Sequence, residues 1–252
     1  MQGPTTSAEK PRTTIVSIHE LKTHCAACSM RELCLPMGLS HDDLVEIDAV
    51  VTSRRRVRKG ETVYRAGQTA SELYAIRMGT LKTTVLAEDG REQVAGYHLA
   101  GDLIGLDGLG LGQHIGDAVA LEDSEVCVMR FDELETLSAR LPALQQNLHR
   151  LLGREVARDH AVMLMLGSMR AEERVAAFLL NIAERYRSRG YSSTEFNLRM
   201  TREEIGSFLG LKLETVSRLF SRMQEEGLIA VQGRSIKLLD TVALRQLAGQ
   251  RA

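Results

Sequence analysis

Residues 201–227, with the sequence TREEIGSFLGLKLETVSRLFSRMQEEG, contain the pattern that decides the fold of this 252-residue chain. Thr201 is followed three positions later by Glu204, a capping box that predicts a helix beginning there and running to Phe208. A second helix is expected over residues 213–226, because Gly227 is a typical residue to end a helix. The short turn between them, Leu-Gly-Leu at 209–211, completes the pattern of a helix-turn-helix.

The second of these helices has one apolar and one polar face. Glu214, Ser217 and Arg218 are expected on the polar face near its start. In a major groove Arg218 could donate to O6 and N7 of guanine, and Glu214 could accept from N4 of cytosine. This pattern predicts binding to double-stranded DNA, with Thr201 and Arg202 as further contacts. The apolar residues expected to set the interhelical angle are Ile205, Leu209, Leu211, Val216, Leu219 and Phe220.

The sequence around this motif indicates a winged domain over residues 169–252. An amphipathic helix is expected over 169–189, and residues 228–238 alternate as a strand, a Gly-Arg turn and a strand. Arg234 and Lys237 in this wing are expected to contact phosphates. From residue 168 onward there are fourteen Lys or Arg against ten Asp or Glu, a weak basic excess. A packing module that binds no DNA could have the same elements, but the complete set of caps and turns favours DNA binding.

The first half of the chain has a different sequence pattern. Short β-rich runs between residues 52 and 130 are separated by glycines at intervals of about ten residues, which is typical of an antiparallel sandwich or roll. Asp89-Gly90 lies between two of these runs and predicts a hairpin turn. We therefore expect an α+β chain with a β-roll sensor domain over residues 37–135. A short helix capped by Ser40 and Asp43 should lead into it.

Helical periodicity continues from about residue 132 to 169, and we assign residues 136–168 to one long dimerisation helix. Such a helix could be buried within a monomer, but a connector of this length between two domains favours a homodimer. Asp159 interrupts the apolar stripe, and two such carboxylates facing each other across a dimer seam would oppose association. Alternatively, Asp159 rotates to solvent and has little effect. The expected interface residues are Leu148, Leu152, Val156, Asp159, Met163 and Leu166.

Composition narrows the other possibilities. No apolar stretch is long enough to span a membrane, and no signal peptide is recognisable, so we expect a cytoplasmic protein. Residues 1–18 are polar and rich in Pro and Thr, which predicts a flexible arm. Aromatic residues make up 4% of the chain and Trp is absent, which argues against base stacking on single strands. No nucleophile–base pair or phosphate loop is recognisable, so an enzyme is not expected.

Four cysteines form the second informative pattern. Cys25, Cys28 and Cys34 lie within residues 19–36, and Cys127 follows 93 positions after Cys34. Four thiolates suffice for an iron–sulfur cluster or for a tetrahedral zinc ion. Zinc ribbons usually have a second C-x2-C knuckle, which this chain lacks, and a redox C-x-x-C normally opens a helix after a strand. Cluster, zinc and unliganded thiols all stay open on the residues alone.

The order of a β-roll, a long helix and a winged helix-turn-helix resembles the CRP/FNR family of bacterial regulators. The motif at 201–219, together with YHLAGDLIG at 97–105 and AEERVAAF at 171–178, is similar to its FNR branch. The resemblance covers residues 25–249 and implies that the β-roll is a jelly roll like those that bind cyclic nucleotides. It also implies a dimeric regulator of anaerobic gene expression, with an oxygen-labile [4Fe-4S] cluster on Cys25, Cys28, Cys34 and Cys127.

The resemblance further implies a palindromic DNA site with TTGAT half-sites, read by Glu214, Ser217 and Arg218. The loop at residues 88–91 would contact RNA polymerase, although it could equally be a solvated hairpin tip. The sequence departs from the cyclic-nucleotide branch, which places an Arg where the nucleotide phosphate binds, because residues 108–122 contain no Arg. No cyclic nucleotide is therefore expected. The alternative hypothesis is a zinc-stabilised or cofactor-free regulator of the same family that senses another signal.

Overall fold

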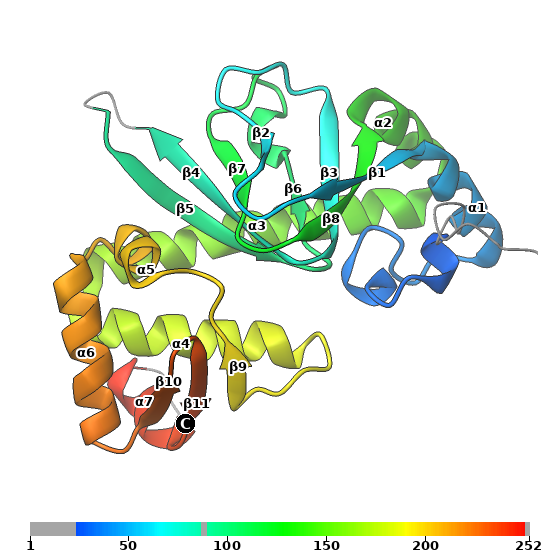
Figure 1. Cartoon of the computed structure of the whole chain (residues 1–252). Helices are drawn as coiled ribbons and strands as arrows, with labels where there is room; N and C mark the ends of the chain where they lie inside the picture. Colours follow the sequence, from blue (N-terminus) through cyan, green and yellow to red (C-terminus); the bar gives the residue numbers. More distant parts are fainter. Residues whose placement is uncertain (1–23, 87–89, 250–252) are drawn as a thin grey trace, which may run out of the picture.

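The computed structural model describes residues 24–86 and 90–249 (Figure 1). The predicted flexible arm, residues 1–18, lies outside the described residues. Asp89 of the predicted hairpin turn and Glu88 of the loop expected to contact polymerase also lie outside them. Within the described part of the chain, no helix is both long and apolar enough to cross a membrane.

The N-terminal segment consists of two short 3-10 turns and one helix. The turns η2 (Cys25–Ala27) and η3 (Arg31–Leu33) precede helix α1 (His41–Val50). Ser40 forms the predicted capping box, because its hydroxyl accepts from the backbone N–H of Asp43 at 3.2 Å. The inner face of α1 is buried against the β-roll, and this contact places the two turns beside the sheet.

The predicted β-roll is confirmed as two four-stranded antiparallel sheets, in the orders β1-β8-β3-β6 and β2-β7-β4-β5. Their facing sides enclose an apolar core that includes Ile76, Leu81 and Val126, all fully buried. A 3-10 turn, η4 (Leu106–Gly108), follows β6. The strands are β1 (Val51–Val57), β2 (Thr62–Tyr64), β3 (Glu72–Met78), β4 (Thr80–Leu86), β5 (Glu92–Leu99), β6 (Leu103–Ile104), β7 (Asp117–Ala120) and β8 (Ser124–Arg130).

The predicted dimerisation helix begins later than expected. Instead of one helix from residue 136, the structure has α2 (Phe131–Arg140) and α3 (Pro142–Ser168). Leu141 between them is extended, with φ −114° and ψ 94°. A proline disfavours helical backbone in the residue before it and is itself well suited to the first position of a helix. Pro142 therefore ends one helix and starts the next.

Helix α3 contributes to two separate cores. Leu144 and Leu148 are buried with α1 and α2 at its start, and Met165 is buried with the C-terminal domain at its end. Leu148, which the sequence analysis assigns to the dimer interface, is only 8% exposed within a single chain, and its role as a dimer contact stays a prediction. The middle of the helix is different, since Val156 and Met163 are 54% and 61% exposed.

The C-terminal domain has the predicted winged helix-turn-helix (Figure 1). Its wing has a third strand that the sequence patterns did not indicate, because β9 pairs with β11 in the sheet order β10-β11-β9. The elements are α4 (Ala171–Arg187), β9 (Glu195–Asn197), α5 (Arg202–Leu209), α6 (Leu213–Glu225), β10 (Ile229–Gln232), β11 (Ser235–Leu238) and α7 (Thr241–Leu247).

The turn between α5 and α6 depends on a glycine that lies inside α5. A Cβ atom at Gly206 would lie 2.5 Å from the carbonyl oxygen of Leu211, which is closer than real Cβ atoms approach. The N–H of Leu211 donates to the carbonyl of Gly206 at 2.8 Å. The two helices therefore meet through backbone atoms, and only a glycine leaves room for this approach.

The C-terminal domain packs directly on the β4–β5 hairpin. The N–H of Val94 donates to the hydroxyl of Ser207 in α5 at 2.9 Å. Next to this bond, Tyr97 of β5 packs edge-on to Phe178 and also contacts Phe208, with ring centroids 6.0 and 5.2 Å apart. The first helix of the DNA-binding motif is thus fixed to the edge of the β-roll.

A group of largely buried charged side chains joins the β-roll to the C-terminal domain at a second place. The carboxylate of Asp102, in the turn between β5 and β6, accepts from Arg185 at 2.5 Å and from Arg189 at 2.9 Å. Arg158 of α3 lies 3.6 Å from it. Burial alone would raise the pKa of Asp102, but the guanidinium groups of Arg185, Arg189 and Arg158 outweigh burial and hold that pKa well below its usual range.

Replacing Asp102 with asparagine should lower the free energy of unfolding by about 3–5 kcal/mol at pH 7, because buried guanidinium groups lose their counter-charge. The folded-state pKa is depressed, so the carboxylate contributes fully above the unfolded value of about 3.9 and loses its contribution as the pH falls below it. Urea unfolding of both proteins should show a constant difference between pH 5 and 8 that shrinks below about pH 4.

The matched control is Asp42→Asn, at an exposed position in the first turn of α1. It should change stability by no more than about 0.5 kcal/mol. If Asp102→Asn cost less than about 1 kcal/mol, as for an exposed ion pair, the ionic group would not be a structural requirement.

Candidate functional site

All four cysteines of the chain line one cavity between the N-terminal segment and the sheet. Cys25 begins η2, Cys28 follows it and Cys34 follows η3, so the three lie on one short segment. Cys127 lies in the middle of β8, which pairs with β1 on one side and β3 on the other. The structure therefore brings together thiols that are 93 residues apart in the sequence, as the cluster prediction requires.

The environment of these thiols disfavours their ionised form. Burial raises the pKa of Cys34 to about 12. Burial and the neighbouring carboxylate of Asp48 raise the pKa of Cys25 well above its usual range. Burial also raises the pKa of Cys127, although Arg54 opposes the shift. Since thiolate is the form that binds metals, a bound metal group would have to displace these protons.

Four thiols around one cavity are a donor set that a [4Fe-4S] cluster or a single zinc ion could use. A tetrahedral zinc ion with Zn–S bonds of about 2.3 Å needs sulfur atoms about 3.8 Å apart. Within residues 24–86 and 90–249, no three His, Cys, Asp or Glu side chains are grouped so that they could hold one metal ion. Four cysteines around one cavity are the usual ligands of a [4Fe-4S] cluster. The cavity has only about 30 Å³ of free space, so the cysteine segment would have to draw back from β8 to admit a cluster.

Two residues that the sequence analysis did not single out organise this cavity. Asp48 of α1 accepts from the backbone N–H of Cys25 at 2.8 Å and from the ring of His24 at 3.1 Å, and so anchors the first turn. Arg54 lies opposite Cys127 in the sheet, and its Nε is buried without a hydrogen-bond partner. Three consecutive arginines at residues 54–56 were a visible signal for Arg54, whereas nothing in the sequence distinguished Asp48.

The polar face predicted for α6 is confirmed as solvent-exposed. Glu214, Ser217 and Arg218 are all exposed, while Val216, Leu219 and Phe220 on the opposite side are buried. Within the described residues, Glu214 and Arg218 have no hydrogen bond or ion pair to another side chain. Their polar groups are therefore available to a ligand along one face of the helix.

The remaining predicted DNA contacts have different surroundings. Arg234 is exposed at the tip of the wing, next to Gly233 with φ +61°. Thr201 is exposed, and its hydroxyl accepts from the N–H of Glu204 at 3.1 Å as the helix cap. Arg202 is half-buried, with its guanidinium 3.6 Å from the ring centroid of Phe220, a cation–π contact.

Only part of the predicted dimer interface on α3 is exposed to solvent. Val156, Asp159 and Met163 are exposed, with Leu164 exposed beside them at 63%. Leu152 is half-buried against the β-roll core, and Leu166 is half-buried near Gly210. The exposed apolar surface of α3 thus lies between Val156 and Leu164, in the middle and the C-terminal part of the helix.

The interior of the β-roll is filled by protein side chains. His114 is 2% exposed, its ring stacks on Tyr64 with centroids 3.8 Å apart, and its Nδ1 lies 3.2 Å from a carboxylate oxygen of Asp107. His114 lies within residues 108–122, the stretch in which the sequence lacks the arginine of the cyclic-nucleotide branch.

The fold and the exposed face of α6 are those of a DNA-binding transcription regulator. Two family models match, one described as a Crp-like helix-turn-helix domain over residues 173–247 and one as a cyclic nucleotide-binding domain over residues 54–140. The chain belongs to the CRP/FNR family, as the resemblance implied.

Similar proteins support this assignment. The chain is 48% identical over 229 residues to the transcriptional regulatory protein btr of Bordetella pertussis, covering 91% of this chain and 95% of that protein. It is 44% identical over 226 residues to the fumarate and nitrate reduction regulatory protein of Escherichia coli K12, covering 90% of each. Among solved structures, FixK2 from Bradyrhizobium japonicum has a TM-score of 0.73 at 31% identity, covering 79% of this chain and 98% of that one.

Proposed function

We propose that this regulator controls genes of anaerobic respiration, such as those for fumarate and nitrate reduction, in response to oxygen. The observation that carries the proposal is the single cavity lined by all four cysteines. The 44% identity to a fumarate and nitrate reduction regulatory protein supports the choice of genes. Cys25, Cys28, Cys34 and Cys127 would hold a [4Fe-4S] cluster, which when bound supplies an oxygen-labile link between the N-terminal segment and β8.

The chain's own residues would transmit the state of this link. Asp48 anchors the first turn through Cys25, and α1 packs beside the start of α3 through Leu44, Ile47 and Leu148 in one core. A change in the cysteine segment would therefore reach α3 through packed side chains. At its other end α3 shares a core with the DNA-binding domain through Met165.

In the proposed complex, α6 enters the major groove of a palindrome with TTGAT half-sites. Two recognition helices about 34 Å apart are needed for two half-sites, so a homodimer is the binding species. Glu214, Ser217 and Arg218 would read base edges, and Arg234 in the wing would contact a phosphate. Arg202 and Thr201 would contribute mainly by fixing the start of α5, since their side chains are engaged there.

Substituting alanine for Arg218 should remove about 1–3 kcal/mol of discrimination between a TTGAT palindrome and a site altered at one base pair. Arg234→Ala should instead weaken both sites equally and reduce the slope of log affinity against log salt by about one. Fluorescence anisotropy titrations over a range of salt concentrations distinguish the two effects. Equal weakening of both sites by Arg218→Ala would contradict its role as a base-reading residue.

No cyclic nucleotide is needed in this proposal. His114, Tyr64 and Asp107 fill part of the β-roll interior, and residues 108–122 contain no arginine to pair with the phosphate of such a ligand. RNA polymerase would be contacted through the β4–β5 hairpin tip, which includes Arg91.

Asp159 would set the threshold for dimerisation. It is exposed on α3 between Val156 and Met163, so in a parallel pair of α3 helices it would face its counterpart. Asp159→Ala should therefore form dimers without a cluster, as measured by sedimentation velocity on protein exposed to air, while Asp42→Ala should stay like the wild type. An Asp159→Ala protein that sediments as a monomer in air would refute this role.

The decisive experiment is to purify the full chain without oxygen and measure its absorbance, iron and sulfide before and after admitting air. We expect about four irons per chain, visible absorbance that bleaches in air, and a parallel loss of binding to the palindrome. Cys127→Ser should abolish the iron content, whereas Met30→Leu, a change in the same cavity that removes no thiol, should preserve it. A colourless zinc protein that binds DNA equally in air would support the alternative of a zinc-stabilised regulator.

A further inference from the structure

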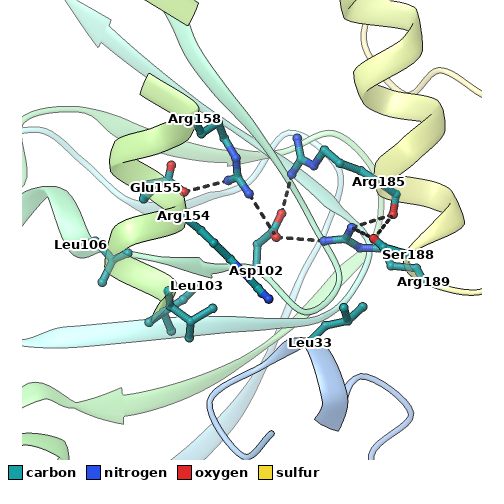
Figure 2. A pocket seen from close by; sticks show the side chains of 11 residues that line it. Leu33, Asp102, Leu103, Leu106, Arg154, Glu155, Arg158, Arg185, Ser188 and Arg189 are labelled. Atoms are coloured by element: carbon teal, nitrogen blue, oxygen red, sulfur yellow. Dashed lines mark hydrogen bonds and ion pairs between the residues drawn. The ribbon is translucent and has the colours of Figure 1, made fainter. Parts of the chain in front are cut away.

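A cationic cavity lies where the parts of the chain meet (Figure 2). It has a volume of about 220 Å³ and is lined by η3, the β5–β6 turn, α3 and the end of α4. Four of its lining side chains are arginines, Arg154 and Arg158 from α3 and Arg185 and Arg189 from the end of α4 and just beyond it. It is separate from the cysteine cavity and from the exposed face of α6.

The charges around this cavity do not balance. Its lining includes four guanidinium groups but only two carboxylates, those of Asp102 and Glu155, which leaves an excess of two positive charges. Asp102 is shared by Arg158, Arg185 and Arg189, and Glu155 accepts from Arg158 at 2.8 Å. Figure 2 shows Arg154 reaching from α3 past Asp102 with no interaction drawn to it. Within the described residues, Arg154 has no hydrogen-bond or ion-pair partner.

A second and independent observation is an unpaired buried donor. The side chain of Arg185 is 13% exposed, and its Nε is buried without a hydrogen-bond acceptor. Its neighbour Arg189 differs, because its Nε donates to the carbonyl oxygen of Ala100 at 2.6 Å. Buried donors in folded proteins are nearly always satisfied by protein, water or a ligand. The cavity therefore has one cation, Arg154, without a partner among the described residues, and next to it the buried Nε of Arg185 lacks an acceptor.

We propose that this cavity binds a small dianion carrying a phosphate group. Two negative charges would match the excess of positive charge, and guanidinium groups bind phosphate oxygens in pairs. The volume is below the roughly 300–1,000 Å³ of pockets for drug-sized ligands, so the cavity admits a phosphate with a small organic remainder. Arg154 donates to the phosphate, while Asp102 keeps Arg158, Arg185 and Arg189 in position beside it.

The site is composite, so ligand binding and domain arrangement are linked. Leu33 lines the cavity and is the residue before Cys34. Its side chain also packs closely on the β5–β6 turn, because a Cβ atom at Gly101 would lie only 2.8 Å from it. A ligand held by α3, α4 and this turn together stabilises the arrangement in which they are adjacent. The dianion thus acts as a second input to the regulator, independent of the cysteines.

The test is isothermal titration of the full chain with inorganic phosphate at pH 7.5, with ionic strength held constant by chloride. We expect saturable binding of one phosphate per chain and about tenfold weaker binding in Arg154→Gln, since one charge-assisted contact is lost. This variant should fold, because Arg154 is exposed and unpaired. Arg245→Gln, an equal loss of charge on α7 away from the cavity, should bind phosphate as the wild type does.

Two further titrations test whether the bound anion must be a phosphate and whether it binds in this cavity. Titration with succinate, a dianion without phosphate, should give at least about tenfold weaker binding than methyl phosphate. Succinate binding of equal strength would overturn the phosphate assignment. Arg218→Gln removes a cation from the DNA-facing surface. Loss of phosphate binding in that variant, with binding kept in Arg154→Gln, would place the anion on the DNA face and refute the cavity, as would an absence of saturable binding.

Discussion

The buried carboxylate of Asp102 is the constraint on which the arrangement of this protein depends. A carboxylate that is largely out of water needs opposite charge around it. Its partners come from three places, since Arg158 lies on α3, Arg185 lies on α4 and Arg189 follows α4. If the end of α4 moved away from the β5–β6 turn, Asp102 would lose its two nearest partners, Arg185 and Arg189. The relative position of sensor and DNA-binding domain is therefore set by charge as well as by apolar packing.

Helix α3 shows how the same chain can be both sensor and effector. Its first turns belong to the core around α1 and the β-roll, and its last turns belong to the core of the winged domain. The exposed middle, with Val156 and Met163, has no partner within the chain. Helix α3 therefore links the core of the β-roll, the core of the winged domain and an exposed apolar surface. A shift of the helix at one of these places changes the geometry at the other two.

The sequence was most informative where structure is determined locally. The capping box at Thr201, the turn glycines and the alternation of the wing predicted the DNA-binding motif within a residue or two at each end. Pro142 is visible as well, but the apolar periodicity continues across it and predicts one helix. Cys127 could be placed with the other cysteines only through family resemblance, because thiols so distant in sequence are brought together by tertiary structure alone.

Long-range features were beyond sequence reasoning for a physical reason. Asp102 and Arg189 lie far apart along the chain, and an acidic residue after a glycine is ordinary turn chemistry. Strand β9 has three residues and no distinctive alternation, so only its pairing with β11 identifies it. Leu148 fits the apolar repeat of both a dimer seam and a monomer core, and periodicity cannot say which of two apolar surfaces a helix face will meet.

The glycine inside α5 has a consequence for how this DNA-binding domain can diverge. At Gly206 the approach of the two motif helices is limited by backbone atoms, with the carbonyl of Leu211 closing the turn. Side chains in the small core beneath can be exchanged for others of similar volume at a cost in stability, while the backbone contact keeps the crossing of the helices unchanged. The exposed face of α6 can then vary independently. Divergent members could in this way acquire new target sequences without rebuilding the scaffold that presents the helix.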